Sequence, residues 1–215
     1  MFLDSARLDE LATATALGFV TGITMNPLLL RRAGVTDARE HLIAAVDAAP
    51  GIPILYQPGA SDPAAFLRQA REAAGIAPDR IVIKIMAMVP FFAVARELAG
   101  SGVGCAMTAV YSPGQALAAR DAGCRWVIPY VDRAARLLPG GQRLVGDMRA
   151  TLDAAGATTT ILAASVKSPE QAVRAVRDGA HEVSVPLEVL AALADHELSR
   201  TAAEGFADAA DGIQW

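Results

Sequence analysis

The chain has 215 residues, of which 53% are hydrophobic, and its 19 basic and 23 acidic side chains give a net charge of −4. This length and apolar content suffice for a buried core, which excludes a disordered protein. The sequence contains no basic block, which argues against nucleic acid or an anionic membrane as the main partner.

Eight short β-like runs alternate with helical patterns along the whole chain. Such repeated units predict a parallel sheet, and eight of them favour a closed (β/α)8 (TIM) barrel of the α/β class. An open doubly wound sheet is the alternative, although no G-x-G-x-x-G follows the first strand. The expected strands are Phe2–Asp4, Val20–Thr24, Pro53–Gln57, Ile81–Met86, Gly104–Val110, Trp126–Val131, Thr159–Ala164 and Glu182–Pro186. The helical patterns cover residues 9–18, 36–49, 62–75, 90–100, 113–123, 142–156 and 168–180.

The C-terminal stretch is longer than one barrel helix needs. Because no linker interrupts the earlier units, we expect residues 1–215 to form a single barrel domain. We expect residues 190–215 to add a helical segment that folds back over the barrel or reaches a neighbouring subunit. The segment ends on Trp215, whose apolar side chain would otherwise be exposed, so we place it at a subunit interface.

The sequence favours a cytoplasmic location. The N-terminus is charged by position 4 and lacks the apolar run of a signal peptide, and no run is long enough for a transmembrane helix. Cys105 and Cys124 lie in or beside apolar runs and are interpreted as buried thiols in a reducing compartment. His41, His181 and His196 show no metal-ligand spacing, so we expect structural roles for them and no metal site.

Lysine is rare in this chain, which has 17 arginines but only Lys84 and Lys167. Unlike arginine, lysine carries an amine that can lose its proton and attack a carbonyl. Lys84 lies in the apolar run IVIKIM, where strand alternation places it with Val82 and Met86 on the face toward the barrel interior. Burial favours the neutral amine, the activated form for Schiff-base chemistry. The alternative is a buried ion pair with Asp4.

Polar residues stand at the C-terminal ends of almost all the expected strands, where (β/α)8 enzymes bind their substrates. A single polar residue at a strand end is uninformative. The convergence of many such residues on one face of the barrel predicts an active site. Asp4 is a candidate general acid or base, or else an N-cap of the following helix. The group comprises Asp4, Asn26, Gln57, Lys84, Thr108, Tyr130, Arg133, Ser165 and Lys167.

Two subsets of this group suggest more specific roles. Gln57 and Tyr130 are able to hold a water molecule, or else are polar residues satisfied by the backbone. Arg133, Ser165 and Lys167 suit an anion such as a phosphate, or else form a solvated rim.

The chain resembles the short transaldolases and fructose-6-phosphate aldolases, which are class I (Schiff-base) barrels. The resemblance spans nearly the whole chain, in the order FLDSARLDEL, GITMNPLLL, IVIKI, GCAMTAVYSPGQALAARDAG, VIPYVDR, LAASVKSPEQ and VPLEVL. It implies sugar-phosphate substrates, no cofactor, and a homo-oligomer, since the aldolase branch forms pentamers that pair into decamers. By position, Lys84 resembles the Schiff-base lysine and Asp4 the carboxylate of proton transfer. Asn26 and Thr108 resemble residues that hold substrate hydroxyls and the catalytic water.

The resemblance also covers the rest of the site. Arg133 and Ser165 resemble the phosphate-binding pair. Gln57 and Tyr130 resemble the aldolase branch, since transaldolases tend to have Glu and Phe there. Asp132 departs from the pattern, which usually has Asn or Gly.

Bulky apolar residues replace small or hydroxylated ones near the expected nucleophile. The family's T-T-N-P-S is changed at Met25 and Leu28, and its K-I/V-P-V-T is changed at Met86 and Met88. We expect these residues to alter the choice of substrate.

The sequence thus predicts an enzyme that cleaves or forms the C3–C4 bond of a ketose phosphate and releases or transfers a three-carbon dihydroxyacetone unit. One alternative is a specialised transaldolase that joins this unit to a longer aldose phosphate. Another is a cofactor-free sugar-phosphate isomerase, although no Glu or His base stands at a strand end. A third is a barrel that binds a sugar phosphate without turnover.

Overall fold

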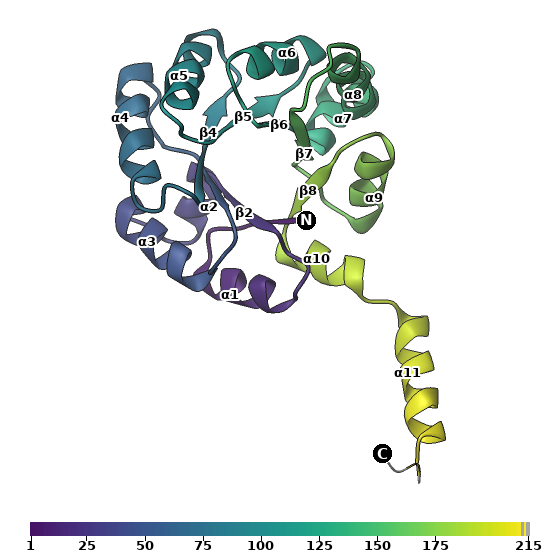
Figure 1. The fold of residues 1–215 in the computed structure, drawn as a ribbon. Coiled ribbons are helices and arrows are strands. Elements are labelled where there is room, and N and C mark those ends of the chain that lie inside the picture. Colours follow the sequence, from purple (N-terminus) through teal and green to yellow (C-terminus); the bar gives the residue numbers. More distant parts are fainter. Residues whose placement is uncertain (212, 214–215) are drawn as a thin grey trace.

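The computed structural model describes residues 1–211 and 213, and its eight parallel strands form a closed barrel in the order β1 to β8. β1 pairs with both β2 and β8, so the barrel has no open edge. Helices surround the ring of strands (Figure 1). The predicted (β/α)8 barrel is therefore confirmed, and the open sheet is wrong. The strands are β1 (Phe2–Asp4), β2 (Gly22–Met25), β3 (Ile54–Tyr56), β4 (Ile81–Met86), β5 (Cys105–Val110), β6 (Trp126–Pro129), β7 (Thr160–Ala163) and β8 (Glu182–Val185).

The helices begin at residues with the capping chemistry that the sequence suggested. The side chains of Asp37, Asp62, Ser112 and Ser168 accept hydrogen bonds from backbone N–H groups in the first turns that follow. No described helix is long and apolar enough to cross a membrane. The helices are α1 (Leu8–Ala16), α2 (Pro27–Arg32), α3 (Ala38–Ala48), α4 (Pro63–Ala74), α5 (Val89–Gly100), α6 (Pro113–Asp121), α7 (Val131–Leu137), the 3-10 helix η1 (Gly141–Arg143), α8 (Leu144–Ala154), α9 (Pro169–Arg177), α10 (Leu187–Ala194) and α11 (Glu197–Ala209).

The core has two apolar layers, one inside the barrel and one between the strands and the helices. In β4, Val82 belongs to the inner layer, and Ile83 and its isoleucine neighbours belong to the outer one, as the alternation predicted. Phe2 fills the barrel beside Gly22, and a Cβ atom at Gly22 would overlap the Phe2 ring. The inner layer comprises Phe2, Leu55, Val82, Ala106, Trp126, Ile128, Leu162 and Ala164.

The C-terminal segment forms two helices with different surroundings. α10 contacts α1, α9 and β1 and buries Val189 and Leu190. α11 extends away from the barrel (Figure 1) and has no buried residue. α11 therefore does not fold back over the barrel, whereas α10 does pack against it. Trp215 lies outside the described residues, and the expected interface stays a prediction.

Candidate active site

A cavity of about 410 Å³ lies where the strands end and their C-terminal loops begin. Eight of the nine predicted site residues line it. The ninth, Thr108, lies fully buried beside it and contacts Tyr130. The convergence inferred from the sequence is therefore present, while the role of each residue stays a prediction. The eight lining residues are Asp4, Asn26, Gln57, Lys84, Tyr130, Arg133, Ser165 and Lys167.

Lys84 reaches this cavity from within β4 and is only 2% exposed. Burial lowers the pKa of its amine, and the negative charge of Asp4 acts in the opposite direction with a smaller effect. Across residues 1–211 and 213, no carboxylate oxygen lies within 4.0 Å of the Lys84 Nζ atom. The buried ion pair with Asp4 is therefore not formed, and the environment favours an uncharged amine.

Asp4 is held at the end of β1 by a buried hydroxyl pair. Thr24 Oγ1 donates a hydrogen bond of 2.7 Å to Asp4 Oδ1 and lies 2.6 Å from Ser184 Oγ. These contacts join β1 to its two neighbours, β2 and β8, and orient the carboxylate beside the cavity. The alternative N-cap role is wrong, because Arg7 occupies the N-cap position of α1.

Tyr130 lines the cavity and contacts Thr108, which lies behind it. Thr108 Oγ1 donates to the Tyr130 hydroxyl at 3.3 Å. β5 is irregular immediately after Thr108, because Ala109 adopts a left-handed conformation with φ of 56° and shifts the register with β6. Burial is the main cause that raises the pKa of Tyr130, so its hydroxyl remains protonated and able to donate.

Asn26 and Gln57 line the cavity from the loops after β2 and β3. The Asn26 Oδ1 atom caps α2 by accepting hydrogen bonds from the N–H groups of Leu28 and Leu29, at 3.0 and 3.1 Å. Its amide nitrogen remains able to donate to a ligand. Asn26 therefore has a structural role that the sequence analysis missed, in addition to its place in the cavity.

The predicted anion-binding residues come together at one side of the cavity. The Arg133 guanidinium lies over the Tyr130 ring, 5.1 Å from its centroid, and donates to the Tyr111 hydroxyl at 3.4 Å. Ser165 has φ of 58°, an unusual conformation for a residue other than glycine. Lys167 is exposed two residues further on. This side therefore presents two cations and a hydroxyl.

Two residues that the sequence analysis did not assign connect the loops of this predicted anion site. Gln171 Oε1 accepts from Lys167 N at 2.8 Å, and Gln171 Nε2 donates to Asp132 Oδ1 at 3.4 Å. The backbone N–H of Asp132 donates to Ser165 O at 3.2 Å. The S-P-E-Q sequence that ends at Gln171 resembles a capping box, and this was the available signal.

Arg32 also lines the cavity and was missed by the sequence analysis. It belongs to the last turn of α2, a helix of six residues that was too short to produce an apolar repeat.

The apolar substitutions near the nucleophile occupy three different environments. Leu28 lines the candidate cavity, whereas Met86 and Met88 line a neighbouring cavity of about 160 Å³. Met25 is fully buried in the outer layer. Its expected place beside the substrate is wrong, because the alternation of β2 turns Thr24 inward and Met25 outward.

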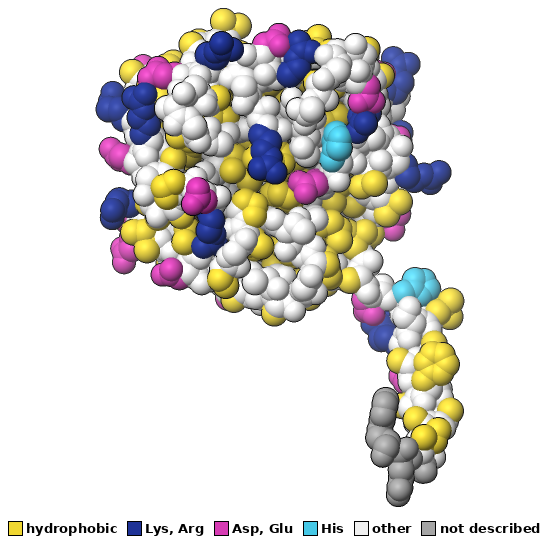
Figure 2. Space-filling view, viewed as in Figure 1, with side chains coloured by type: hydrophobic (Ala, Val, Ile, Leu, Met, Phe, Trp, Pro, Cys, Tyr) yellow, Lys and Arg dark blue, Asp and Glu magenta, His cyan; other side chains and the backbone are white. Residues whose placement is uncertain are grey.

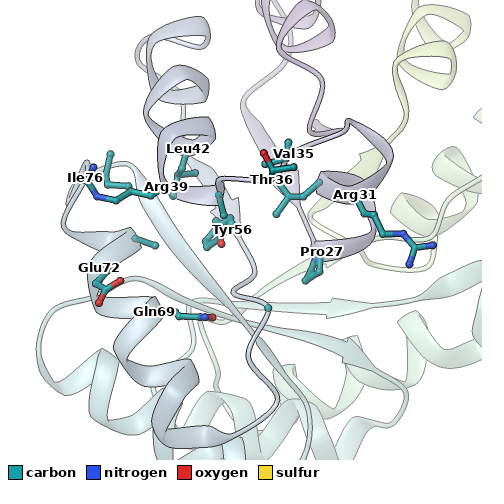
Figure 3. Close-up of a pocket in the computed structure, with 14 residues that line it drawn as sticks. Pro27, Arg31, Val35, Thr36, Arg39, Leu42, Tyr56, Gln69, Glu72 and Ile76 are labelled. Atoms are coloured by element: carbon teal, nitrogen blue, oxygen red, sulfur yellow. The ribbon is translucent and has the colours of Figure 1, made fainter.

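A second large cavity, of about 390 Å³, lies between α2, α3 and α4 (Figure 3). It shares only Pro27 with the candidate site. Arg31, Arg39 and Glu72 line it, together with the buried Tyr56. It has no lysine among its lining residues, so Schiff-base chemistry at an amine belongs to the first cavity.

The cysteines and two of the histidines have structural surroundings, as predicted. Cys105 and Cys124 are free and buried, and burial raises the pKa of both thiols to about 12. His181 accepts a backbone hydrogen bond and His196 caps α11. The His41 Nε2 atom is buried without a hydrogen-bond partner in the described chain. Among the same residues, no three His, Cys, Asp or Glu side chains are grouped to hold a metal ion.

Comparisons with known proteins identify the family of this chain. The family model described as Transaldolase/Fructose-6-phosphate aldolase matches residues 1–214. A probable transaldolase of Chlorobium phaeovibrioides is 31% identical over 99% of this chain and 98% of its own length. One of an Anaeromyxobacter species is 34% identical over 95% and 94%, respectively.

Among solved structures, a putative lactate oxidase of Pediococcus acidilactici superposes with a TM-score of 0.60, covering 86% of this chain and 62% of that one. At 14% identity this similarity supports the barrel fold alone. The family model and the sequence relatives also identify the family. The chain is therefore an enzyme that belongs to the transaldolase/fructose-6-phosphate aldolase family.

Proposed function

We propose that this enzyme is a class I aldolase or transaldolase in which Lys84 forms a Schiff base with a ketose phosphate. The observation that carries the proposal is the position of Lys84, which is buried, free of any ion pair in the described chain, and adjacent to a cavity shared with Asp4. A desolvated lysine amine is the form that attacks carbonyl carbon.

The reaction begins when the Lys84 amine attacks C2 of the ketose, and loss of water gives an iminium ion. Asp4, directly or through a water molecule, removes the proton of the C4 hydroxyl. The C3–C4 bond then breaks, its electron pair moves into the iminium to form an enamine, and an aldehyde leaves. Protonation and hydrolysis of the enamine complete an aldolase cycle. Attack of the enamine on a second aldehyde completes a transaldolase cycle.

The remaining residues bind and orient the substrate in this scheme. Gln57, Thr108 and Tyr130 hold a water near the enamine, which favours its protonation and therefore aldol cleavage. Asn26 donates to a substrate hydroxyl. The substrate phosphate binds to the predicted anion site, made by Arg133, Ser165 and Lys167.

Borohydride reduction tests the covalent step. Incubation with a ketose phosphate followed by reduction is expected to add the mass of the reduced substrate to a peptide that contains Lys84. Lys84→Arg removes the nucleophilic amine and should give no adduct and no turnover. Lys167→Arg is the matched control and should be labelled at Lys84 as the wild type is. Labelling of Lys167, or of no lysine, contradicts the proposal.

Transfer to an aldose phosphate is the second candidate reaction, and Leu28 is the observation that favours it. This residue lines the cavity at a position where the family resemblance implies serine. Loss of a hydroxyl contact weakens binding of an ordinary polyol chain by roughly 1 kcal/mol. The substitution therefore favours an acceptor aldose that is longer or less polar. We therefore expect added aldose phosphates to accelerate consumption of fructose 6-phosphate. Efficient cleavage that no added aldose improves would leave an ordinary aldolase.

A further inference from the structure

The loops that follow β5 and β7 share a sequence pattern and an unusual backbone conformation. Two segments of seven residues, 109–115 and 165–171, both read x-Val-x-Ser-Pro-x-Gln. The first residue of each is left-handed, with φ of 56° at Ala109 and 58° at Ser165, and no other non-glycine residue in the described chain has a positive φ. Because this conformation is strained for a residue with a Cβ atom, its recurrence at the same position indicates that the two loops share one scaffold.

The glutamine that ends each segment ties two parts of the chain together. Gln115 Oε1 accepts from Tyr111 N at 2.8 Å, and Gln115 Nε2 donates to Ala87 O at 2.9 Å. Gln171 uses the same two atoms, one toward its own loop and one toward Asp132 on α7. In both copies the acceptor therefore holds the loop of the glutamine's own strand. The donor reaches the segment that follows the preceding strand, which is β4 for Gln115 and β6 for Gln171.

The Gln115 contact restrains the end of the strand that carries the candidate nucleophile. Ala87 is buried directly after β4, three residues beyond Lys84. The Ala87 N–H donates to Thr108 O at 3.0 Å, and the Ala87 carbonyl accepts from Gln115. These two bonds hold the end of β4 against β5 and α6, and so restrain Lys84 relative to Thr108. Gln115 is not one of the residues that line the candidate cavity, so its effect on chemistry passes through these contacts.

We infer that Gln115 is a positioning residue for the chemical step, whereas its counterpart Gln171 positions the predicted anion site. This inference rests on the proposed function, in which Lys84 is the nucleophile and Thr108 helps to hold the water near the enamine. Both groups act on the reacting carbons, whereas the substrate phosphate binds beyond the ends of β6 and β7 in the same scheme. Loss of the Gln115 contact should therefore lower kcat, and loss of the Gln171 contact should weaken phosphate binding.

Gln115→Glu and Gln115→Met separate positioning from helix capping. Glu keeps the acceptor for Tyr111 N but places a carboxylate oxygen against Ala87 O, while Met makes neither bond. A residue that only caps α6 predicts wild-type kcat for the Glu variant and a loss for the Met variant alone. A positioning role predicts that both variants lower kcat for fructose 6-phosphate by about 10- to 100-fold, because a small misplacement of reacting groups has an effect of this size.

Titration calorimetry with a hexitol 6-phosphate provides the second readout. This polyol has no carbonyl and therefore cannot form a Schiff base. Both Gln115 variants should bind it with wild-type affinity, which also shows that their sites are folded. Gln171→Glu is the matched counterpart and should show the opposite pattern, namely weaker binding of the polyol with little change in kcat.

Wild-type kcat in Gln115→Glu would overturn the inference, as would an equal loss of polyol affinity in Gln115→Glu and Gln171→Glu. Failure of the proposed function has a different signature, namely the absence of a borohydride adduct on Lys84 in the wild type. An adduct on Lys84 together with an unchanged Gln115→Glu variant would reject only the positioning role of Gln115.

Discussion

The ionisation of Lys84 has a consequence for stability as well as for chemistry. Burial lowers the pKa of the folded amine below its ordinary value of 10.5. At pH values between the pKa of Lys84 in the folded chain and its ordinary pKa, the unfolded chain binds a proton that the folded chain does not. The free energy of unfolding therefore rises with pH through this window, and the buried lysine is destabilising below it.

Lys84→Met should remove this dependence. We expect the variant to be more stable than wild type near neutral pH, with an advantage that shrinks as the pH rises toward about 10. Thermal melting across this range measures the effect. Lys167→Met, which replaces an exposed lysine, is the control and should follow the wild-type profile. A Lys84→Met profile parallel to wild type would contradict a lowered pKa.

Arg133→Ala tests the predicted phosphate contact. Losing a charge-assisted hydrogen bond should raise KM for phosphorylated substrates by about 10-fold or more. The KM for unphosphorylated analogues should hardly change. An equal loss for both substrate types would rule out a phosphate role.

The sequence predicted the cavity residues at the strand ends better than the residues that reach the cavity from helices. Eight residues converge as expected, because strands of a closed parallel barrel deliver their C-terminal ends to one rim. Arg32 and Gln171 were missed because they act from helices, where the direction of a side chain depends on helix bounds and rotation. Met25 was misplaced because a one-residue difference in strand position reverses the face.

At the level of elements, the contact between α7 and α9 positions the predicted anion site. Asp132 on α7 and Gln171 on α9 are joined by a side-chain hydrogen bond, and Gln171 also holds the backbone of Lys167. These contacts restrain the loop that contains Ser165 in its left-handed conformation. We expect this loop to become more mobile when the hydrogen bond between Asp132 and Gln171 is broken.

Gln171→Glu tests this arrangement, because it keeps the acceptor for Lys167 N and loses the donor to Asp132. KM for phosphorylated substrates should rise by about 10-fold or more, because a hydrogen bond to the Asp132 carboxylate is replaced by repulsion between two carboxylates, with little change in kcat. Adding Asp132→Asn restores a donor and should recover much of the loss. A double variant that performs no better than the single one would argue against a positioning role.

The secondary structure was predictable to within a few residues wherever a segment had a repeat and a cap. β1 and β4 have the expected bounds, and the other strands are shorter than the apolar runs that contain them or shifted by one or two residues. α2 was not predicted, because six residues that begin at a proline after Asn26 show no periodicity. The C-terminal ends of β3, β6, β7 and β8 were predicted one or two residues too late.

At the level of the whole molecule, α11 is the feature that one chain does not explain. Leu198 and Phe206 on this helix are 71% and 74% exposed, and hydrophobic side chains are visible along it in Figure 2. A helix that has exposed apolar side chains and no buried residue favours docking on another subunit. We therefore propose a homo-oligomer, such as a pentamer or decamer, in which residues 190–215 contribute to the interface.

Light scattering at micromolar concentration measures this directly. The wild type should have the mass of several chains, and Phe206→Glu should shift the population toward smaller species by placing a charge in the interface. Val173→Glu, at a half-exposed apolar position on α9, is the control and should keep the wild-type mass. A wild-type mass equal to one chain would refute the assembly.

The closure of the barrel also determines at which stage of synthesis the candidate active site can form. Asp4 is oriented through Thr24 and Ser184, and β1 pairs with β8, so the carboxylate depends on contacts between the first strand and the last. A ribosome makes these strands about 180 residues apart, and domains generally fold as units during synthesis. A nascent chain that has emerged only as far as β7 therefore already carries the amine of Lys84, but lacks Ser184 and the strand pairing that help to orient Asp4. On the proposed function, catalysis at this amine therefore requires that β8 has been synthesised and has paired with β1.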